Sequence, residues 1–107
     1  MAEITTPEPN ILSITGEIDL HESPHLKQAF EPLIKKKTPR VVVDFNGVSY
    51  VDSSGLAVFL EAMQRIQAYG GKFAIYGLRD NVRSIFELAR LDQIFRIFPD
   101  KGSALKA

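Results

Sequence analysis

A buried strand that leads directly into an amphipathic helix constrains the fold of this chain more than any other feature. Residues 41–45 (VVVDF) form an apolar run of the kind that fills the centre of a parallel sheet. Apolar side chains then recur at the i, i+3, i+4, i+7 spacing of one helix face, at Leu56, Phe59, Leu60, Met63 and Ile66. A strand followed by a helix of this kind predicts an α/β domain.

Two short strands and a helix are predicted before this unit. A glycine separates the strands, at residues 11–15 and 17–20. Ser23 followed by Pro24 then predicts a helix start, with the serine as N-cap and the proline as first helical residue. Pro32 lies within the same helical pattern, where its missing N–H group is expected to kink or shorten the helix.

Further elements follow the central helix. Residues 72–76 predict a strand, a third helix begins at about Asp80, and a final strand at residues 94–98 is stopped by Pro99. Two strands at the start, then strands alternating with helices, predict a single α/β domain. Its sheet is expected to be mixed and mostly parallel, with helices packed on it.

The length and charge of the chain suit one small domain. Its 107 residues include 13 basic and 13 acidic ones, so no net charge draws the surface to nucleic acid or an acidic membrane. It has no cysteine, and no apolar run approaches the ~18 residues of a membrane span. We therefore expect a cytoplasmic protein that is a monomer when free. We assign residues 11–98 to the domain, 1–10 to an N-terminal extension and 99–107 to a frayed tail.

The letters H-E-x-x-H at residues 21–25 match a zinc peptidase motif but not its required setting. Such a site needs both histidines on one continuous helix face. Because Ser23 and Pro24 predict a helix start between them, we expect His21 outside the helix and His25 in its first turn. No nucleophile elbow or phosphate-binding loop is present either. The sequence therefore predicts no metal, no cofactor and no catalytic residues, so an enzyme is not expected.

The turn between the central strand and helix is the candidate functional segment. Asp52 and Ser53 are both favoured N-cap residues, at a point where backbone N–H groups are unpaired and the helix dipole is positive. A serine hydroxyl held there is exposed, and a phosphate attached to it would be well accommodated. A purely structural cap would use the same residues, so the pattern alone leaves both interpretations open.

Three segments together make the chain resemble the STAS domain family, and within it the anti-sigma factor antagonists, also called anti-anti-sigma factors. They are residues 16–19 (GEID), residues 52–56 (DSSGL), and residues 82–98 with the core FELARL. The resemblance covers about residues 11–98 and implies a STAS-like single domain. A further C-terminal helix is usual in the family, and here residues 103–105 are at most its remnant.

The resemblance implies a site at the same turn. In this family the serine directly after the motif aspartate is phosphorylated by a partner that is both a serine kinase and an anti-sigma factor. That serine is Ser53, and Ser54 is the less likely acceptor. Asp19 matches an aspartate that lies near the serine and helps partner recognition. Its polar neighbours, His21 and Glu22, predict an exposed carboxylate that faces the motif. The implied partner-binding residues are Asp19, Asp52, Ser53, Ser54, Gly55 and Leu56.

The implied function is a phosphorylation-controlled protein-interaction switch. The unphosphorylated domain would bind the anti-sigma factor serine kinase and release the sigma factor, and phosphorylation of Ser53 would abolish that binding. A serine phosphatase of the PP2C type would reset the switch. The alternatives are a non-switching STAS subunit of a transporter or signalling scaffold, and, third, an enzyme.

We predict that the purified protein contains no stoichiometric metal, because the helix start at Ser23 and Pro24 separates the two histidines. Elemental analysis after mild dialysis checks this. About one zinc ion per chain would contradict the prediction and favour the hydrolase interpretation.

Overall fold

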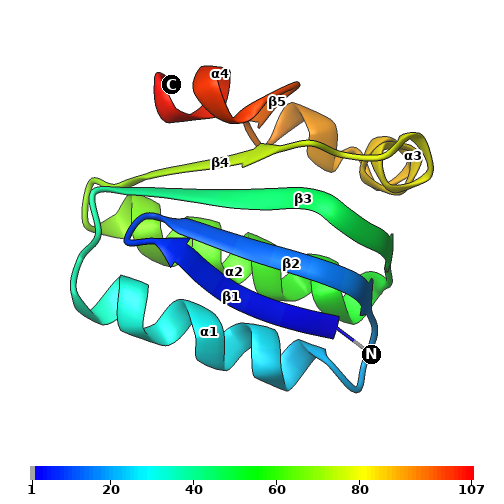
Figure 1. The fold of residues 1–107 in the computed structure, drawn as a ribbon, viewed down its shortest axis with the longest axis horizontal. Helices are drawn as coiled ribbons and strands as arrows, with labels where there is room; N and C mark the ends of the chain where they lie inside the picture. Colours follow the sequence, from blue (N-terminus) through cyan, green and yellow to red (C-terminus); the bar gives the residue numbers. More distant parts are fainter. Residues whose placement is uncertain (1) are drawn as a thin grey trace.

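Five strands form one sheet in this computed structural model, which describes residues 2–107 (Figure 1). Their order in the sheet follows their order in the chain. The first pair is antiparallel and the other neighbouring pairs are parallel, which confirms the predicted mixed, mostly parallel sheet. The strands are β1 (Ala2–Glu8), β2 (Ile11–Ile18), β3 (Arg40–Val51), β4 (Lys72–Tyr76) and β5 (Ile97–Phe98).

The helices cover the two faces of the sheet unequally. They are α1 (Ser23–Lys35), α2 (Ser53–Ala68), α3 (Asp80–Leu88) and α4 (Lys101–Leu105), with a short 3-10 helix η1 (Leu91–Gln93). The long helices α1 and α2 lie side by side on one face, and α4 lies on the other (Figure 1). Right-handed crossovers between successive parallel strands place α1 and α2 on the same face. Of the helices in residues 2–107, none has the length and apolar character that crossing a membrane requires.

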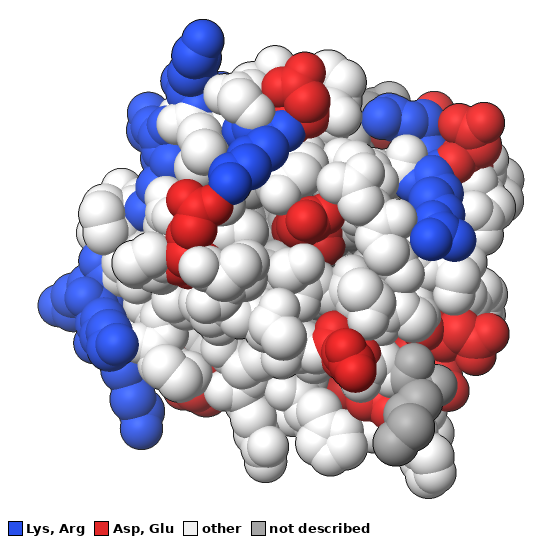
Figure 2. Space-filling model, in the orientation of Figure 1, with Lys and Arg blue, Asp and Glu red and all other residues white. Residues whose placement is uncertain are grey.

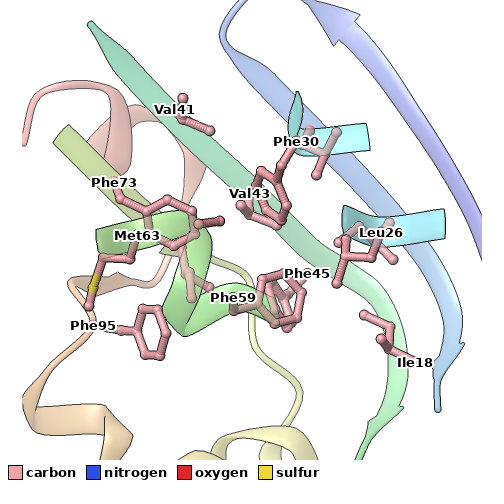
Figure 3. Packing of buried hydrophobic residues seen from close by; sticks show 14 of the residues in the cluster. Ile18, Leu26, Phe30, Val41, Val43, Phe45, Phe59, Met63, Phe73 and Phe95 are labelled. Carbon is pink, nitrogen blue, oxygen red and sulfur yellow. The ribbon is translucent and has the colours of Figure 1, made fainter. Parts of the chain in front are cut away.

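Six phenylalanines join the elements on the α1–α2 face into one core. Each ring contacts two others, with centroids 5.0–6.0 Å apart, so the contacts close into a circuit. Figure 3 labels Phe30, Phe45, Phe59, Phe73 and Phe95 together with Met63 and neighbouring aliphatic side chains. Edge-to-face and tilted pairs at such distances stabilise by about 0.5–1.5 kcal/mol each beyond their buried area. In order around the circuit they are Phe30, Phe59, Phe45, Phe86, Phe95 and Phe73.

The two central strands are longer than we predicted. β2 continues through Gly16, which adopts a φ of 94° where the pairing with β3 shifts register. β3 runs on to Val51, although β4 pairs with it only as far as Asp44. Beyond that point α3 lies beside β3: Arg79 Nε donates to the Asn46 carbonyl (3.1 Å) and the Asn81 side-chain amide donates to the Ser49 carbonyl (2.7 Å). These side chains replace the missing neighbouring strand.

The N-terminal residues belong to the sheet, whereas we had assigned residues 1–10 to an extension. β1 pairs with β2, with Ile4 opposite Ile14, and Ile4 packs against the core. The final strand is shorter than the predicted 94–98, because the turn and bend that follow η1 occupy residues 94 and 95 and only β5 remains. Both differences depend on a partner strand distant in sequence, which local periodicity does not specify.

The C-terminal residues form a packed helix rather than the frayed tail we expected. Asp100 caps α4, since its carboxylate accepts a hydrogen bond from the Ser103 N–H (2.8 Å). Ala104 is fully buried and belongs to a second apolar cluster on the far face of the sheet. Ile11, Val42, Ala74 and Tyr76 complete the buried part of that cluster. Only the contact with the sheet makes so short a helix stable.

Helix α1 differs from its prediction in two details. Glu22 occupies the N-cap position without a side-chain cap, and Ser23 is already helical. Pro32 does not interrupt the helix, which continues to Lys35 before Lys37 adopts a φ of 53°. The proline therefore lies in the last turn, where its missing N–H group affects little of the helix.

We predict that Ala104→Lys lowers the free energy of unfolding by about 2 kcal/mol or more, because a lysine in that fully buried position forces α4 off the sheet. The matched control is Ala89→Lys, at the exposed end of α3, which should stay within about 0.5 kcal/mol of the parent. Urea unfolding of the three proteins measures the difference. Equal stabilities for the two variants would contradict the packing of α4.

Candidate functional site

The candidate turn lies at the carboxyl end of β3, where the chain enters α2. Asp52 is the N-cap, with extended backbone, and Ser53 is the first helical residue. The Asp52 N–H donates to the Ile18 carbonyl at the end of β2 (3.0 Å). The structure thus confirms a helix start at this motif and assigns the cap to the aspartate.

The Asp52 carboxylate organises the turn. Its Oδ1 atom accepts hydrogen bonds from the Gly55 N–H (3.1 Å) and from the Ser54 hydroxyl (2.5 Å). The pKa of Asp52 lies below its ordinary value of 3.8, and the hydrogen bond from the Ser54 hydroxyl is the largest cause. Partial burial of the carboxylate raises the pKa, whereas hydrogen bonds from nearby backbone amides lower it further. Asp52 is therefore ionised at neutral pH and acts as an acceptor only.

The two serines of the motif have different surroundings. Ser53 is exposed, and no described residue forms a hydrogen bond with its hydroxyl. Ser54 is half-buried and bonded on two sides, to Asp52 and to the hydroxyl of Ser23 in α1 (2.8 Å). Capping and turn formation thus use Asp52 and Ser54 and leave the Ser53 hydroxyl free.

Gly55 and Leu56 connect the turn to the core. Gly55 is buried, and a Cβ atom there would lie 2.8 Å from Ile18 Cγ2 and 2.9 Å from Val51 Cγ1. Only glycine therefore allows α2 to approach β2 and β3 so closely. Leu56 is half-buried and packs against the main core, so only part of its side chain is available to a partner.

Asp19 lies at the same end of the sheet as the turn. It follows Ile18, which pairs with Val51, the residue before Asp52. We expected an exposed carboxylate, but Asp19 is half-buried and its Oδ1 atom accepts from the His21 N–H (3.0 Å) and the Glu22 N–H (3.1 Å). Asp19 therefore holds the loop before α1 in shape.

Three residues at this end of the sheet were not predicted as part of the site. Ser23 was predicted as a helix cap, but it is 7% exposed and its hydroxyl contacts Ser54. Leu20 and Tyr50 are large apolar residues that are 74% and 46% exposed. A leucine within a polar loop was the available signal for Leu20, whereas nothing local predicts the contact of Ser23. The exposed apolar side chains add a surface beside the turn.

The histidines of the zinc-like motif lie apart from any metal-binding cluster. His21 is in the turn before α1, and His25 in the first turn of α1 has its Nδ1 atom 3.3 Å from Glu22 Oε2. Within residues 2–107, no three His, Asp or Glu side chains gather as metal ligands. On the face shown in Figure 2, basic side chains lie towards the edges and no basic stripe crosses the middle.

We predict that Ser54→Ala lowers the free energy of unfolding at neutral pH by about 1 kcal/mol. Asp52 has a lowered pKa in the folded state, so its ionised form adds stability above pH 3.8 that is lost as the pH falls through the folded pKa. The difference in the free energy of unfolding between parent and variant should therefore become smaller below pH 3.8. Ser84→Ala, which removes a hydroxyl bonded to the Asp80 carbonyl, should give a gap that does not change with pH. Unfolding curves over a pH series decide this, and a constant gap for Ser54→Ala would contradict it.

Comparison with known proteins places the whole chain in one family. Residues 2–104 match the STAS domain. An anti-sigma-B factor antagonist from Listeria monocytogenes is 33% identical over 84 residues, which cover 78% of this chain and 74% of that protein. An anti-sigma factor antagonist from Mycobacterium paratuberculosis has a similar structure, with a TM-score of 0.84 at 24% identity over 99% of this chain and 91% of that one.

A further similar structure is known in two states. The anti-sigma factor antagonist SpoIIAA in its unphosphorylated form gives a TM-score of 0.70 at 17% identity, over 96% of this chain and 92% of that one. SpoIIAA of Bacillus in its phosphorylated form gives 0.70 at 18% identity, over 99% and 97%. At these identities the likeness concerns the fold. With the match over residues 2–104 and the Listeria relative, which confirm the resemblance seen in the sequence, this chain belongs to the STAS domain family.

Proposed function

We propose that this chain is an anti-sigma factor antagonist that acts as a phosphorylation-controlled protein-interaction switch. The unphosphorylated form binds an anti-sigma factor serine kinase and so releases a sigma factor. Phosphorylation of Ser53 abolishes this binding, and a PP2C-type serine phosphatase restores it. The proposal places the protein in the cytoplasm, as a regulatory subunit rather than an enzyme.

The observation that carries this proposal is the free hydroxyl of Ser53. If Ser53 were only a structural cap, its hydroxyl would bond within the turn, but here Asp52 is the N-cap and Ser54 supplies the hydroxyl that bonds to it. Ser53 remains exposed at the start of α2. This favours the switch over a non-switching transporter or scaffold subunit.

The surroundings of Ser53 explain how one phosphate could control binding. Leu20 and Tyr50 expose apolar surface at the same end of the sheet, which suits a protein partner. A phosphate adds about 1.5 to 2 negative charges beside that surface. In a closed interface these charges lose water without gaining a matched cation, so binding weakens. The first turn of a helix accepts negative charge, so the fold itself should be retained.

Phosphorylation requires only one group from this chain, the Ser53 hydroxyl. The Ser53 Oγ atom attacks the γ-phosphorus of ATP bound to the kinase, the bond to the β–γ bridging oxygen breaks, and ADP leaves. The hydroxyl proton passes to a base on the kinase. In the separate reset reaction, water attacks the phosphorus at the phosphatase and the bond to the serine oxygen breaks. Inorganic phosphate is released, and the serine oxygen regains a proton.

Asp19 has a supporting role in this proposal. Its side chain bonds to the amides of His21 and Glu22, which sets the loop that carries Leu20. Recognition by a partner therefore depends on Asp19 through the shape of that loop, together with Asp52, Ser54, Gly55 and Leu56, which shape the turn.

We predict that Ser53→Ala binds the anti-sigma factor kinase as tightly as the parent, and that Ser53→Asp binds at least about tenfold more weakly because it adds a charge at the interface. Gln67→Glu adds the same charge at an exposed position near the other end of α2 and should bind like the parent. Calorimetry measures these affinities against each anti-sigma factor serine kinase encoded in the source genome.

Melting curves of the same proteins provide the control for folding. Ser53→Ala should melt with the parent, because Asp52 and Ser54 provide the cap. Equal affinities for the parent, Ser53→Ala and Ser53→Asp would mean that Ser53 does not control binding, and the switch would be rejected.

A further inference from the structure

Ser23 is the polar residue that the described part of the chain buries most completely. It is 7% exposed, at the first position of α1, and its hydroxyl lies 2.9 Å from the Asp19 carbonyl and 2.8 Å from Ser54 Oγ. A buried hydroxyl destabilises a protein unless it is hydrogen-bonded. Ser23 and Ser54 lie 31 residues apart, so their contact joins the loop before α1 to the turn before α2.

Counting protons fixes the direction of these hydrogen bonds. Asp52 is ionised and can only accept, so the single proton of the Ser54 hydroxyl points to Asp52. The proton between the two serines must therefore come from Ser23. The Asp19 carbonyl is a second acceptor within reach of the same proton (2.9 Å), so the Ser23 hydroxyl shares it between that carbonyl and Ser54 Oγ (2.8 Å). The order of donation is thus Ser23 to Ser54 to Asp52.

We propose that Ser23 is a positioning residue that holds Ser54 in the turn and thereby directs the phosphoryl group to Ser53. The inference rests on the proposed function. Ser54 gives its proton to Asp52 and receives one from Ser23, whereas the Ser53 hydroxyl is free and exposed. Attack by Ser54 on ATP would break both hydrogen bonds and place a phosphate beside the Asp52 carboxylate.

Removing the Ser23 hydroxyl should release Ser54 from one of its two constraints. A serine that has lost one hydrogen bond can rotate out of the turn and compete with its neighbour as the nucleophile. A hydrogen bond contributes about 1 kcal/mol. Because about 1.4 kcal/mol corresponds to a factor of ten, the loss of one such bond changes a ratio about fivefold. We therefore expect Ser23→Ala to raise the ratio of phosphate on Ser54 to phosphate on Ser53 about fivefold.

The test is phosphorylation of the intact protein by each anti-sigma factor serine kinase of the source genome with ATP, followed by mass mapping of the two serines. The parent, Ser23→Ala and Ser84→Ala are compared, since Ser84 is an exposed serine whose hydroxyl bonds only within α3. Ser84→Ala should give the parent ratio. A purely structural loss at Ser23 would lower the melting temperature without moving phosphate from one serine to the other.

The outcomes separate this inference from the proposed function. Phosphate on Ser53 in the parent with an unchanged ratio in Ser23→Ala overturns the role of Ser23 and leaves the switch intact. A parent that accepts no phosphate from any of these kinases overturns the switch and this inference together. A double-mutant cycle of Ser23→Ala and Ser54→Ala in urea unfolding tests the bond itself, and additive effects would reject it.

Discussion

The closed circuit of six phenylalanines is the contact on which the rest of the structure depends. It takes one ring from α1, one from α2 and one from α3, and joins them to β3, β4 and the segment after η1. Each ring is buried against two others, so no helix on that face can shift without separating a pair. Phe59 and Phe86 fix α2 and α3 relative to Phe45, and thereby fix the end of β3 where the serine turn begins.

The part of β3 beyond Asp44 carries the turn to the carboxyl end of the sheet. β4 stops pairing at Asp44, so the following residues have a strand neighbour on one side only. Arg79 and Asn81, at the start of α3, donate side-chain hydrogen bonds to the exposed carbonyls. An unpaired strand edge would otherwise invite pairing with another chain. α3 therefore protects this edge and leaves the turn itself open to a partner.

At the turn, packing and electrostatics assign separate roles to adjacent residues. Asp52 caps the helix, Ser54 bonds to Asp52, and Gly55 allows the close approach of α2 to the strands. Ser53 takes none of these roles, and its freedom is what the proposed switch uses. The contact between Ser23 and Ser54 joins this turn to the loop of Asp19 and Leu20, so the whole end of the sheet forms one surface. A substitution that removes this hydrogen bond should therefore alter the surroundings of both serines.

The sequence by itself determined the elements whose cause is local. The strand at β4, the helix start at Asp52 and the mixed sheet follow from apolar periodicity and from capping residues, which act over a few positions. The tertiary structure alone decided that β1 joins the sheet, that α4 packs on its far face, and that Ser23 bonds to Ser54. It also decided that the Asp19 carboxylate, which we expected to be exposed, bonds to two amides of its own loop. Each of these outcomes depends on which partner a side chain or strand meets in the fold, and no local spacing records that choice.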